Sequence, residues 1–398
     1  MSRLNELIEK LCPNGVKFNK LSDLLDYIQP TKYIVKSTKY SDENEIPVLT
    51  AGQTFVLGYT NEIQGVYNAS RNNPVIIFDD FTTSFKWVDF KFKVKSSAMK
   101  ILVPKCDINM RYIYYAMQCI KYKPKEHSRQ WIANFSQNNI PVPPLEVQQE
   151  IVHILDKFTE LTAELTAELT IRKQQYKYFN DKIFDLRNNT NTKKVKMSDI
   201  LISLKTGLNP RKFFELNTSD ANAYYVTVRE IGNRKVDYLQ AKDRINQYAL
   251  NRINERSNLE INDVLFSGTG TIGRVSLVEE EPKNWNVKEG VYILKPNLQR
   301  VNPVYLMYLM RSNYMKDIYS NYIVGSPVSS IPMKDLKKLE FNIPSLEEQE
   351  RIIKILDVFD KLCNDISDGL PAEIEMRKKQ HEYYRNKLLN FSEVLPNE

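Results

Sequence analysis

Two adjacent carboxylates are the first residues of this sequence that could do chemistry. Asp79 and Asp80 follow an apolar run and open a polar loop that continues to Ser84. Paired carboxylates can hold a divalent cation that activates water against a phosphodiester. No third carboxylate or histidine stands beside this pair to complete such a site. A nuclease using Asp79 and Asp80 is therefore the least favoured hypothesis, and we expect no catalytic residue and no bound metal in this chain.

A glycine-rich segment is the second candidate. Residues 268–273 read G-T-G-T-I-G and follow the strand-like residues 263–266. A dinucleotide-binding fingerprint needs a helix directly afterwards. Here residues 274–278 alternate between polar and apolar side chains, as a second strand would. The pattern predicts a glycine-rich hairpin, which together with Arg274 could approach a phosphate backbone closely.

Basic and hydroxyl side chains near these loops suit nucleic acid. Residues 90–95 alternate strictly and predict one apolar and one lysine face, or else an ordinary half-exposed strand. Residues 121–129 are basic and precede Trp131, and residues 229–235 form a basic turn after a predicted strand. The candidate DNA-binding residues are Thr82, Thr83, Ser84, Lys91, Lys93, Lys100, Arg129, Arg229, Arg234, Lys235, Thr269, Thr271 and Arg274.

The net charge is unevenly distributed. It is +6 in residues 1–140 and +7 in residues 191–340, but −2 in residues 141–190 and −4 in residues 341–398. Two basic segments separated by mildly acidic ones suit a polyanion that is gripped at two places, and duplex DNA or RNA is the obvious candidate.

Two long helical segments must position these candidates. Residues 145–186 contain no Gly or Pro and carry an apolar seam with a 3.5-residue period, which predicts one unbroken helix packed against another. Residues 344–391 repeat the seam but carry a helix breaker around Gly369 and Pro371. The predicted helix-pairing residues are Leu155, Phe158, Leu165, Leu169, Leu356, Phe359 and Ile366.

The repeat extends beyond the helices. I-L-D at residues 154–156 returns at 355–357, and N-x-x-Y-x-x-Y at 109–115 returns at 302–308. The matched segments keep their order, while the middle of each half differs. A duplicated unit that diverges in its middle predicts two related sites with different ligands.

These features together resemble the specificity subunit of type I restriction–modification systems over essentially the whole chain. The telling residues are P-L-E-V-Q-Q-E-I at 144–151 with its twin after Leu346, and a T-A-E-L tandem at 162–169 that looks like the type IC branch. The resemblance implies an α+β fold with a pseudo-twofold repeat. It comprises two α/β target-recognition domains (residues 1–143 and 191–343) and two long antiparallel coiled-coil helices (residues 144–190 and 344–398).

The resemblance also implies partners and cofactors. Each recognition domain would read one half of a bipartite site in double-stranded DNA. Two methyltransferase subunits would dock on the framework, and restriction subunits would join them. S-adenosylmethionine, ATP and Mg would be used by those partners and not by this chain. In agreement, the sequence has no Asn-Pro-Pro-Phe or Asp-Pro-Pro-Tyr segment and no Walker-type phosphate loop.

The tandem suggests that the length of the helix sets the length of the gap between the two DNA half-sites, as a ruler would. One four-residue unit of helix adds about 6 Å and about 40° of rotation, and one DNA base pair is a comparable step. Deleting Thr166–Leu169 should shorten the gap between half-sites by about one base pair. A helical stutter without consequence is the alternative.

Composition bounds the remaining alternatives. A chain of 398 residues with 42% hydrophobic residues predicts at least two domains. No apolar run approaches 18 residues, so a cytoplasmic protein without a membrane partner is expected. Two rivals remain: a specificity subunit of an assembly in which methylation and cleavage share one polypeptide, and a stand-alone DNA-binding or architectural protein.

Overall fold

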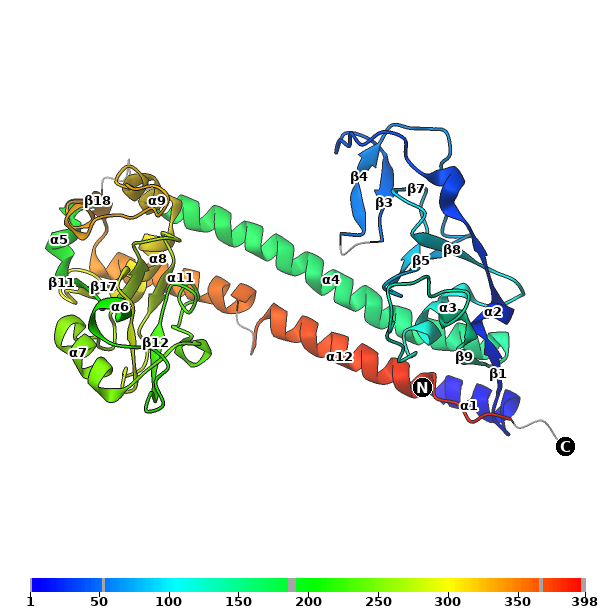
Figure 1. Cartoon of the computed structure of the whole chain (residues 1–398). Helices are drawn as coiled ribbons and strands as arrows, with labels where there is room; N and C mark the ends of the chain where they lie inside the picture. The colour runs from blue at the N-terminus through cyan, green and yellow to red at the C-terminus, as the bar shows by residue number, and fades with distance from the viewer. Residues whose placement is uncertain (1, 52–53, 185–190, 365–367, 395–398) are drawn as a thin grey trace. The chain divides into compact units, whose positions relative to one another are not determined.

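The computed structural model describes residues 2–51, 54–184, 191–364 and 368–394. The chain forms two compact units. Unit 1 contains both the N-terminal part and the C-terminal end of the chain. Unit 1 comprises Met1–Thr166 and Glu373–Glu398, and unit 2 comprises Ala167–Ala372. Each unit contains both helices and sheets, in line with the α+β class predicted from the sequence (Figure 1).

Unit 1 is built on three small sheets. Their strand orders are β2-β8-β5-β6, β4-β3-β7 and β1-β9, and β3 pairs with β7 in parallel. Its strands are β1 (Lys17–Lys20), β2 (Leu25–Ile28), β3 (Ile46–Leu49), β4 (Val56–Thr60), β5 (Val75–Asp79), β6 (Phe85–Val88), β7 (Lys93–Val94), β8 (Met99–Pro104) and β9 (Asn139–Val142). Its short helices are α1 (Ser2–Leu11), α2 (Leu21–Leu24), η1 (Pro30–Tyr33), α3 (Met110–Met117) and η2 (Phe135–Gln137).

Unit 2 repeats this topology strand for strand. Its sheets have the orders β11-β17-β14-β15, β13-β12-β16 and β10-β18, and β12 pairs with β16 in parallel. Its strands are β10 (Lys193–Lys196), β11 (Leu201–Thr206), β12 (Ala223–Val226), β13 (Arg244–Ile245), β14 (Val264–Ser267), β15 (Val275–Leu277), β16 (Trp285–Val287), β17 (Val291–Pro296) and β18 (Glu340–Ile343). Its short helices are α5 (Met197–Ile200), α6 (Pro210–Phe213), η4 (Tyr238–Gln240), α7 (Gln247–Ser257), α8 (Pro303–Arg311), α9 (Asn313–Ser320) and α10 (Met333–Leu336).

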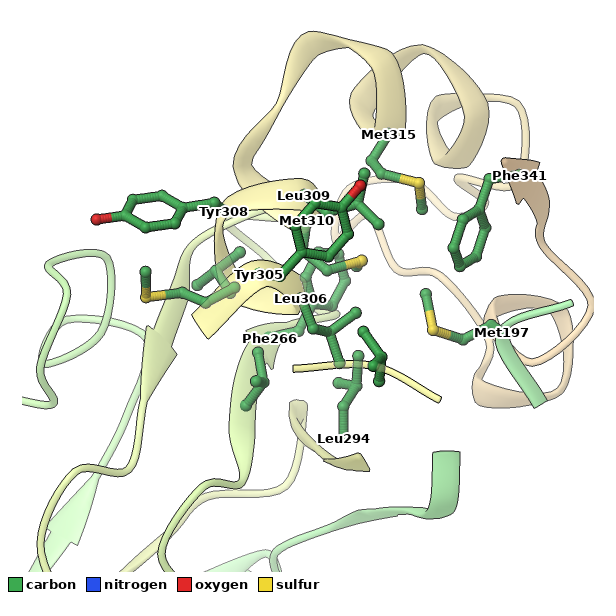
Figure 2. Packing of buried hydrophobic residues seen from close by; sticks show 14 of the residues in the cluster. Met197, Phe266, Leu294, Tyr305, Leu306, Tyr308, Leu309, Met310, Met315 and Phe341 are labelled. Atoms are coloured by element: carbon green, nitrogen blue, oxygen red, sulfur yellow. The ribbon is translucent and has the colours of Figure 1, made fainter. Parts of the chain in front are cut away.

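The main core of unit 2 lies between α8 and the four-stranded sheet. Six consecutive residues of α8, from Tyr305 to Met310, are fully buried, because strands cover one side of this helix and α9 and the long helices cover the others. Figure 2 shows Phe266 of β14 and Leu294 of β17 beside five of these residues, Tyr305, Leu306, Tyr308, Leu309 and Met310. Each such side chain contributes about 1.5–3 kcal/mol by leaving water. This packing holds the β14–β15 end of the sheet in place.

A capped helix occupies the same position in both units. Asn109 caps α3 in unit 1, and Asn302 caps α8 in unit 2, each through its side-chain oxygen. The backbone N–H of each asparagine donates to a buried glutamine, Gln148 at 3.0 Å and Gln349 at 2.9 Å. Because these glutamines lie in the first turns of α4 and α11, the same hydrogen bond joins the capped helix to a long helix in both units.

The long helices follow the predicted seam. Helix α4 (Leu145–Ile183) is unbroken over 39 residues. The second copy is divided into α11 (Leu346–Asn364) and α12 (Leu370–Leu388), as the Gly-Pro break predicts. With this arrangement and the repeated topology, the predicted α+β fold with an internal repeat and two long helical segments is confirmed.

Aromatic pairs mark the seam within each unit. In unit 1 the ring of Phe158 stacks on Tyr384 with centroids 5.3 Å apart. In unit 2 Phe359 meets Tyr176 and Phe179 at 6.1 and 5.6 Å. Of the other predicted seam residues, Leu155 and Leu356 are buried and Leu165 and Leu169 are half-buried, while Ile366 lies outside the described residues.

Candidate nucleic-acid interface

The Asp79–Ser84 loop of unit 1 is the turn of the β5–β6 hairpin. Asp79 accepts hydrogen bonds from the backbone N–H groups of Phe81 and Thr82 and from the Thr82 hydroxyl at 2.5 Å. The hydroxyls of Thr82 and Ser84 lie 3.0 Å apart at the exposed tip, whereas Thr83 is buried and has a positive φ of 60°. Asp79 therefore shapes the loop that presents the hydroxyls of Thr82 and Ser84.

Asp80 fastens this hairpin to the loop between α3 and η2. Its carboxylate is 1% exposed and accepts from the backbone N–H groups of Gln130 and Trp131 at 3.1 and 2.9 Å. The carboxylates of Asp79 and Asp80, which suggested a nuclease, thus both accept hydrogen bonds from backbone N–H groups. Within the described residues, no group of three His, Cys, Asp or Glu side chains is arranged to hold a metal ion.

Lys100 and Arg129 differ in accessibility although both approach Asp80. Lys100 is 2% exposed, and its ammonium group lies 3.6 Å from Asp80 and 2.6 Å from Gln29. Burial lowers the pKa of Lys100, while the Asp80 charge opposes that shift. Arg129 keeps half of its side chain exposed at 3.9 Å from the same carboxylate. We therefore assign Lys100 to the interior and Arg129 to the surface.

The lysine face predicted for residues 90–95 is wrong. Lys93 is 2% exposed, and its ammonium group contacts Glu62 at 3.0 Å and the carbonyl of Gln64 at 2.6 Å. The short strand β7 is covered on both sides, so Lys93 is buried like its neighbours, whereas Lys91 lies outside the strand and is exposed. Alternation predicts exposure only where one side of a strand faces water.

The basic loop at residues 121–129 lies over the hairpin of unit 1. The rings of Phe81 and His127 stack with centroids 4.9 Å apart. Trp131, in contrast, is buried against Phe78 and belongs to the core. The exposed surface of unit 1 thus combines hydroxyls from the hairpin with positive charge from this loop.

The glycine-rich segment of unit 2 occupies the equivalent place. Strands β14 and β15 pair antiparallel around residues 268–274, which confirms the predicted hairpin. A Cβ on Gly268 would lie 2.0 Å from the ring of Tyr292, so this position requires glycine. The hairpin is tied to the loop between α9 and α10 by the N–H of Gly270, which donates to the carbonyl of Ser329 at 2.8 Å. Thr269 is half-buried, and Thr271 and Arg274 are exposed.

Three arginines converge beside this hairpin. Arg229, Arg274 and Arg311 line a cavity of about 500 Å³ together with Asn233. Arg274 donates to the carbonyl of Val228 at 2.9 Å. Arg311 lies deeper, and burial lowers its pKa. Arg229 keeps 58% of its side chain exposed although it contacts Asp243 at 3.3 Å. Glu230 and Asp237 also line the cavity, so its three arginines outnumber its acidic residues by one.

Arg234 belongs to the framework, by which we mean the contacts that join the capped helix of each unit to its long helix. Its guanidinium contacts Asp357 of α11 and, at 2.8 Å, Glu279, and it lies 3.1 Å from the hydroxyl of Tyr308. Its neighbour Lys235 is 65% exposed and lies 3.3 Å from Glu279. Of the two, Lys235 remains on the candidate surface.

Sequence reasoning missed the framework contacts that both units share. Asp156 of unit 1 accepts from Arg111 at 2.8 Å and from Tyr115 at 2.5 Å. In unit 2, Asp357 likewise accepts from Tyr308 at 2.7 Å. Both aspartates stand in the repeated motif I-L-D, and both tyrosines stand in N-x-x-Y-x-x-Y. The repetition of both motifs is the sequence signal that marks these residues, although it does not reveal that the two motifs contact each other.

Comparison with known proteins decides the family. A family model described as the type I restriction modification DNA specificity domain matches residues 13–175 and again residues 189–376. The chain belongs to this family. It is 38% identical over 418 residues to the type I restriction enzyme EcoR124I/EcoR124II specificity subunit of Escherichia coli, covering 98% of each chain. As the sequence predicted, the chain is a non-catalytic specificity subunit.

Solved structures show the same fold. The S subunit of a type I restriction–modification system from M. genitalium superposes with a TM-score of 0.58 at 13% identity, covering 95% of this chain and 97% of that one. A chain from a study of assembly and conformational transition of the type I restriction–modification system gives 0.57 at 15% identity, with coverage of 95% and 98%. No helix among the described residues is long and apolar enough to cross a membrane.

Proposed function

We propose that this specificity subunit reads a bipartite site in double-stranded DNA, with one recognition unit for each half-site. The observation that carries the proposal is the contrast within the repeat. Both units have the same strand order and the same capped helix, yet their hairpin loops read D-F-T-T-S and G-T-G-T-I-G-R. Two equivalent surfaces with different side chains suit two different half-sites.

The proposed surface consists of the accessible candidates. Hydroxyls can donate to and accept from base edges in the major groove, where each base pair has its own pattern of donors and acceptors. Lysine and arginine contacts to phosphates fix register and add salt-dependent affinity. The proposed DNA-contacting residues are Thr82, Ser84, Lys91, Arg129, Arg229, Lys235, Thr269, Thr271 and Arg274.

The proposed partners follow from the repeat. Two methyltransferase subunits would dock on the two copies of the framework, and restriction subunits would join that core. In this division of labour, S-adenosylmethionine, ATP and Mg are bound by the partners, and this chain supplies recognition. We also propose a cytoplasmic location for this subunit, where its DNA partner would be accessible.

Methylation sequencing tests the function. The chain is co-expressed with the adjacent methyltransferase gene, and methylated adenines are mapped by single-molecule sequencing. We expect one split motif with a fixed non-specific gap. Binding of the complex to DNA without methylation would contradict the proposal and favour a stand-alone DNA-binding protein.

A further inference from the structure

One turn carries the same residue type in both units although the surrounding segments differ. Lys95 follows β7 in unit 1, and Lys288 follows β16 in unit 2. The backbone N–H of each lysine donates at 2.8 Å to the carbonyl of the paired strand, Leu49 in one unit and Val226 in the other. The two lysines are therefore structural equivalents.

The turn that carries each lysine is bonded to the recognition hairpin. The N–H of Asp80 donates to the carbonyl of Ala98 at 3.0 Å, and the N–H of Gly268 donates to that of Gly290 at 2.9 Å. Lys288 also lines a cavity of about 400 Å³ together with Thr269 and Gly270 of the hairpin. The segment that follows each lysine is thus hydrogen-bonded to the hairpin proposed to read bases.

These lysines differ from the buried ones by their surroundings. Lys288 is exposed, and Lys95 is half-buried with its ammonium group 3.3 Å from the hydroxyl of Tyr40. Within the described residues, neither ammonium group forms an ion pair, whereas Lys93 and Lys100 do. The positive charges of Lys95 and Lys288 are therefore available to a ligand.

We propose that Lys95 and Lys288 are paired phosphate anchors, each of which sets the position of its unit on the DNA backbone without reading sequence. This inference rests on the proposed function. A residue that two differently specific units share cannot encode their difference, and the backbone is the part of the ligand that two half-sites have in common. A lysine ammonium on a flexible stem binds phosphate as a point charge and tolerates any base sequence.

Salt-dependent binding tests the anchors. The complex with its methyltransferase subunits is titrated with duplexes that carry either the wild-type motif or a scrambled motif, at about 50–200 mM salt. Lys288→Ala and Lys95→Ala should each weaken both duplexes by the same factor, about 3- to 10-fold. Each should also reduce the slope of log Kobs against log salt by about 0.9, and the methylated motif should stay unchanged.

Two further variants sharpen the test. Lys288→Arg should restore the salt slope. Lys283→Ala, at a side chain that is 77% exposed and paired with Glu281, should leave both affinities and the slope unchanged. An unchanged slope in Lys288→Ala, or a changed base in the motif, would overturn the anchor assignment. Absence of any split motif in the wild type would instead contradict the proposed function.

Discussion

Asp156 in unit 1 and Asp357 in unit 2 hold equivalent positions and bind the same kinds of group. Each accepts from a tyrosine of the capped helix and from an arginine. The arginine of unit 1, Arg111, comes from the helix itself, whereas Arg234 of unit 2 comes from the turn after β12. The framework has kept its contacts while a different segment supplies the guanidinium. The repeat therefore preserves the base of each unit and leaves the loops free to change.

The largest effect is expected from the helix that connects the two units. Deleting Thr166–Leu169 from α4 removes one copy of the tandem at the point where unit 1 ends and unit 2 begins. Both units stay intact, so both half-sites should persist while the gap shortens by about one base pair. Sequencing of methylated adenines measures the gap, and an unchanged gap would contradict the ruler.

A steric difference separates the two hairpins. Asp80 is accommodated in unit 1, but the equivalent Gly268 faces the Tyr292 ring, so Gly268→Val should destabilise unit 2 by about 3 kcal/mol through overpacking. Gly270→Asn is the control, because nothing lies within 4 Å of its Cβ position and asparagine tolerates its φ of +77°. Hydrogen exchange of the β14 and β17 amides reports the change. Equal protection in both variants would disprove the steric requirement.

An ionisable group in unit 2 replaces an apolar residue of unit 1. Asp263 directly precedes β14, where Val75 stands in β5, and burial raises the pKa of Asp263 to about 6 although Lys295 opposes the shift. The folded state therefore holds a proton that the unfolded state releases near pH 4. The stability of unit 2 should fall by about 1 kcal/mol per pH unit as pH rises from about 4 to 6, and stay level above that.

The variant Asp263→Asn isolates this effect. The difference between wild type and variant in amide protection of unit 2 should depend on pH between about 4 and 6 and be constant at higher pH. A difference that is constant across the whole range would contradict the raised pKa. Amides of unit 1 serve as the internal control.

The smallest effect concerns the two framework aspartates. Asp156→Ala should cost about 1–2 kcal/mol, because Arg111 and the Tyr115 hydroxyl both lose their bond to this carboxylate. Asp357→Ala should cost less, since Arg234 keeps Glu279 at 2.8 Å. Unfolding in denaturant, followed unit by unit through amide exchange, ranks the two variants. The opposite order would show that Glu279 does not compensate Arg234 for the loss of Asp357.

The sequence predicted the fold well because periodicity and repetition report backbone geometry directly. The seam of α4, the break at Gly369 and the β14–β15 hairpin were all predictable from spacing. Side-chain accessibility was less predictable. Lys93 and Lys100 look like surface lysines in the sequence, but they are buried by segments more than 25 residues away, Glu62 and Gln29 among them. Arg234 also looks like a surface residue in the sequence, because its partner Asp357 is distant along the chain.

Whether each unit reads one half-site can be measured by altering one hairpin and sequencing the whole methylated motif. Thr269 and Thr271 are replaced together by alanine, and Thr82 and Ser84 serve as the matched pair in unit 1. The methylated motif of each variant is then sequenced beside that of the wild type. Each altered base contact should relax discrimination by about 1–3 kcal/mol. We expect each double variant to change one half of the motif, a different half in each case, with the gap unchanged. Changes in both halves from a single hairpin would contradict this expectation.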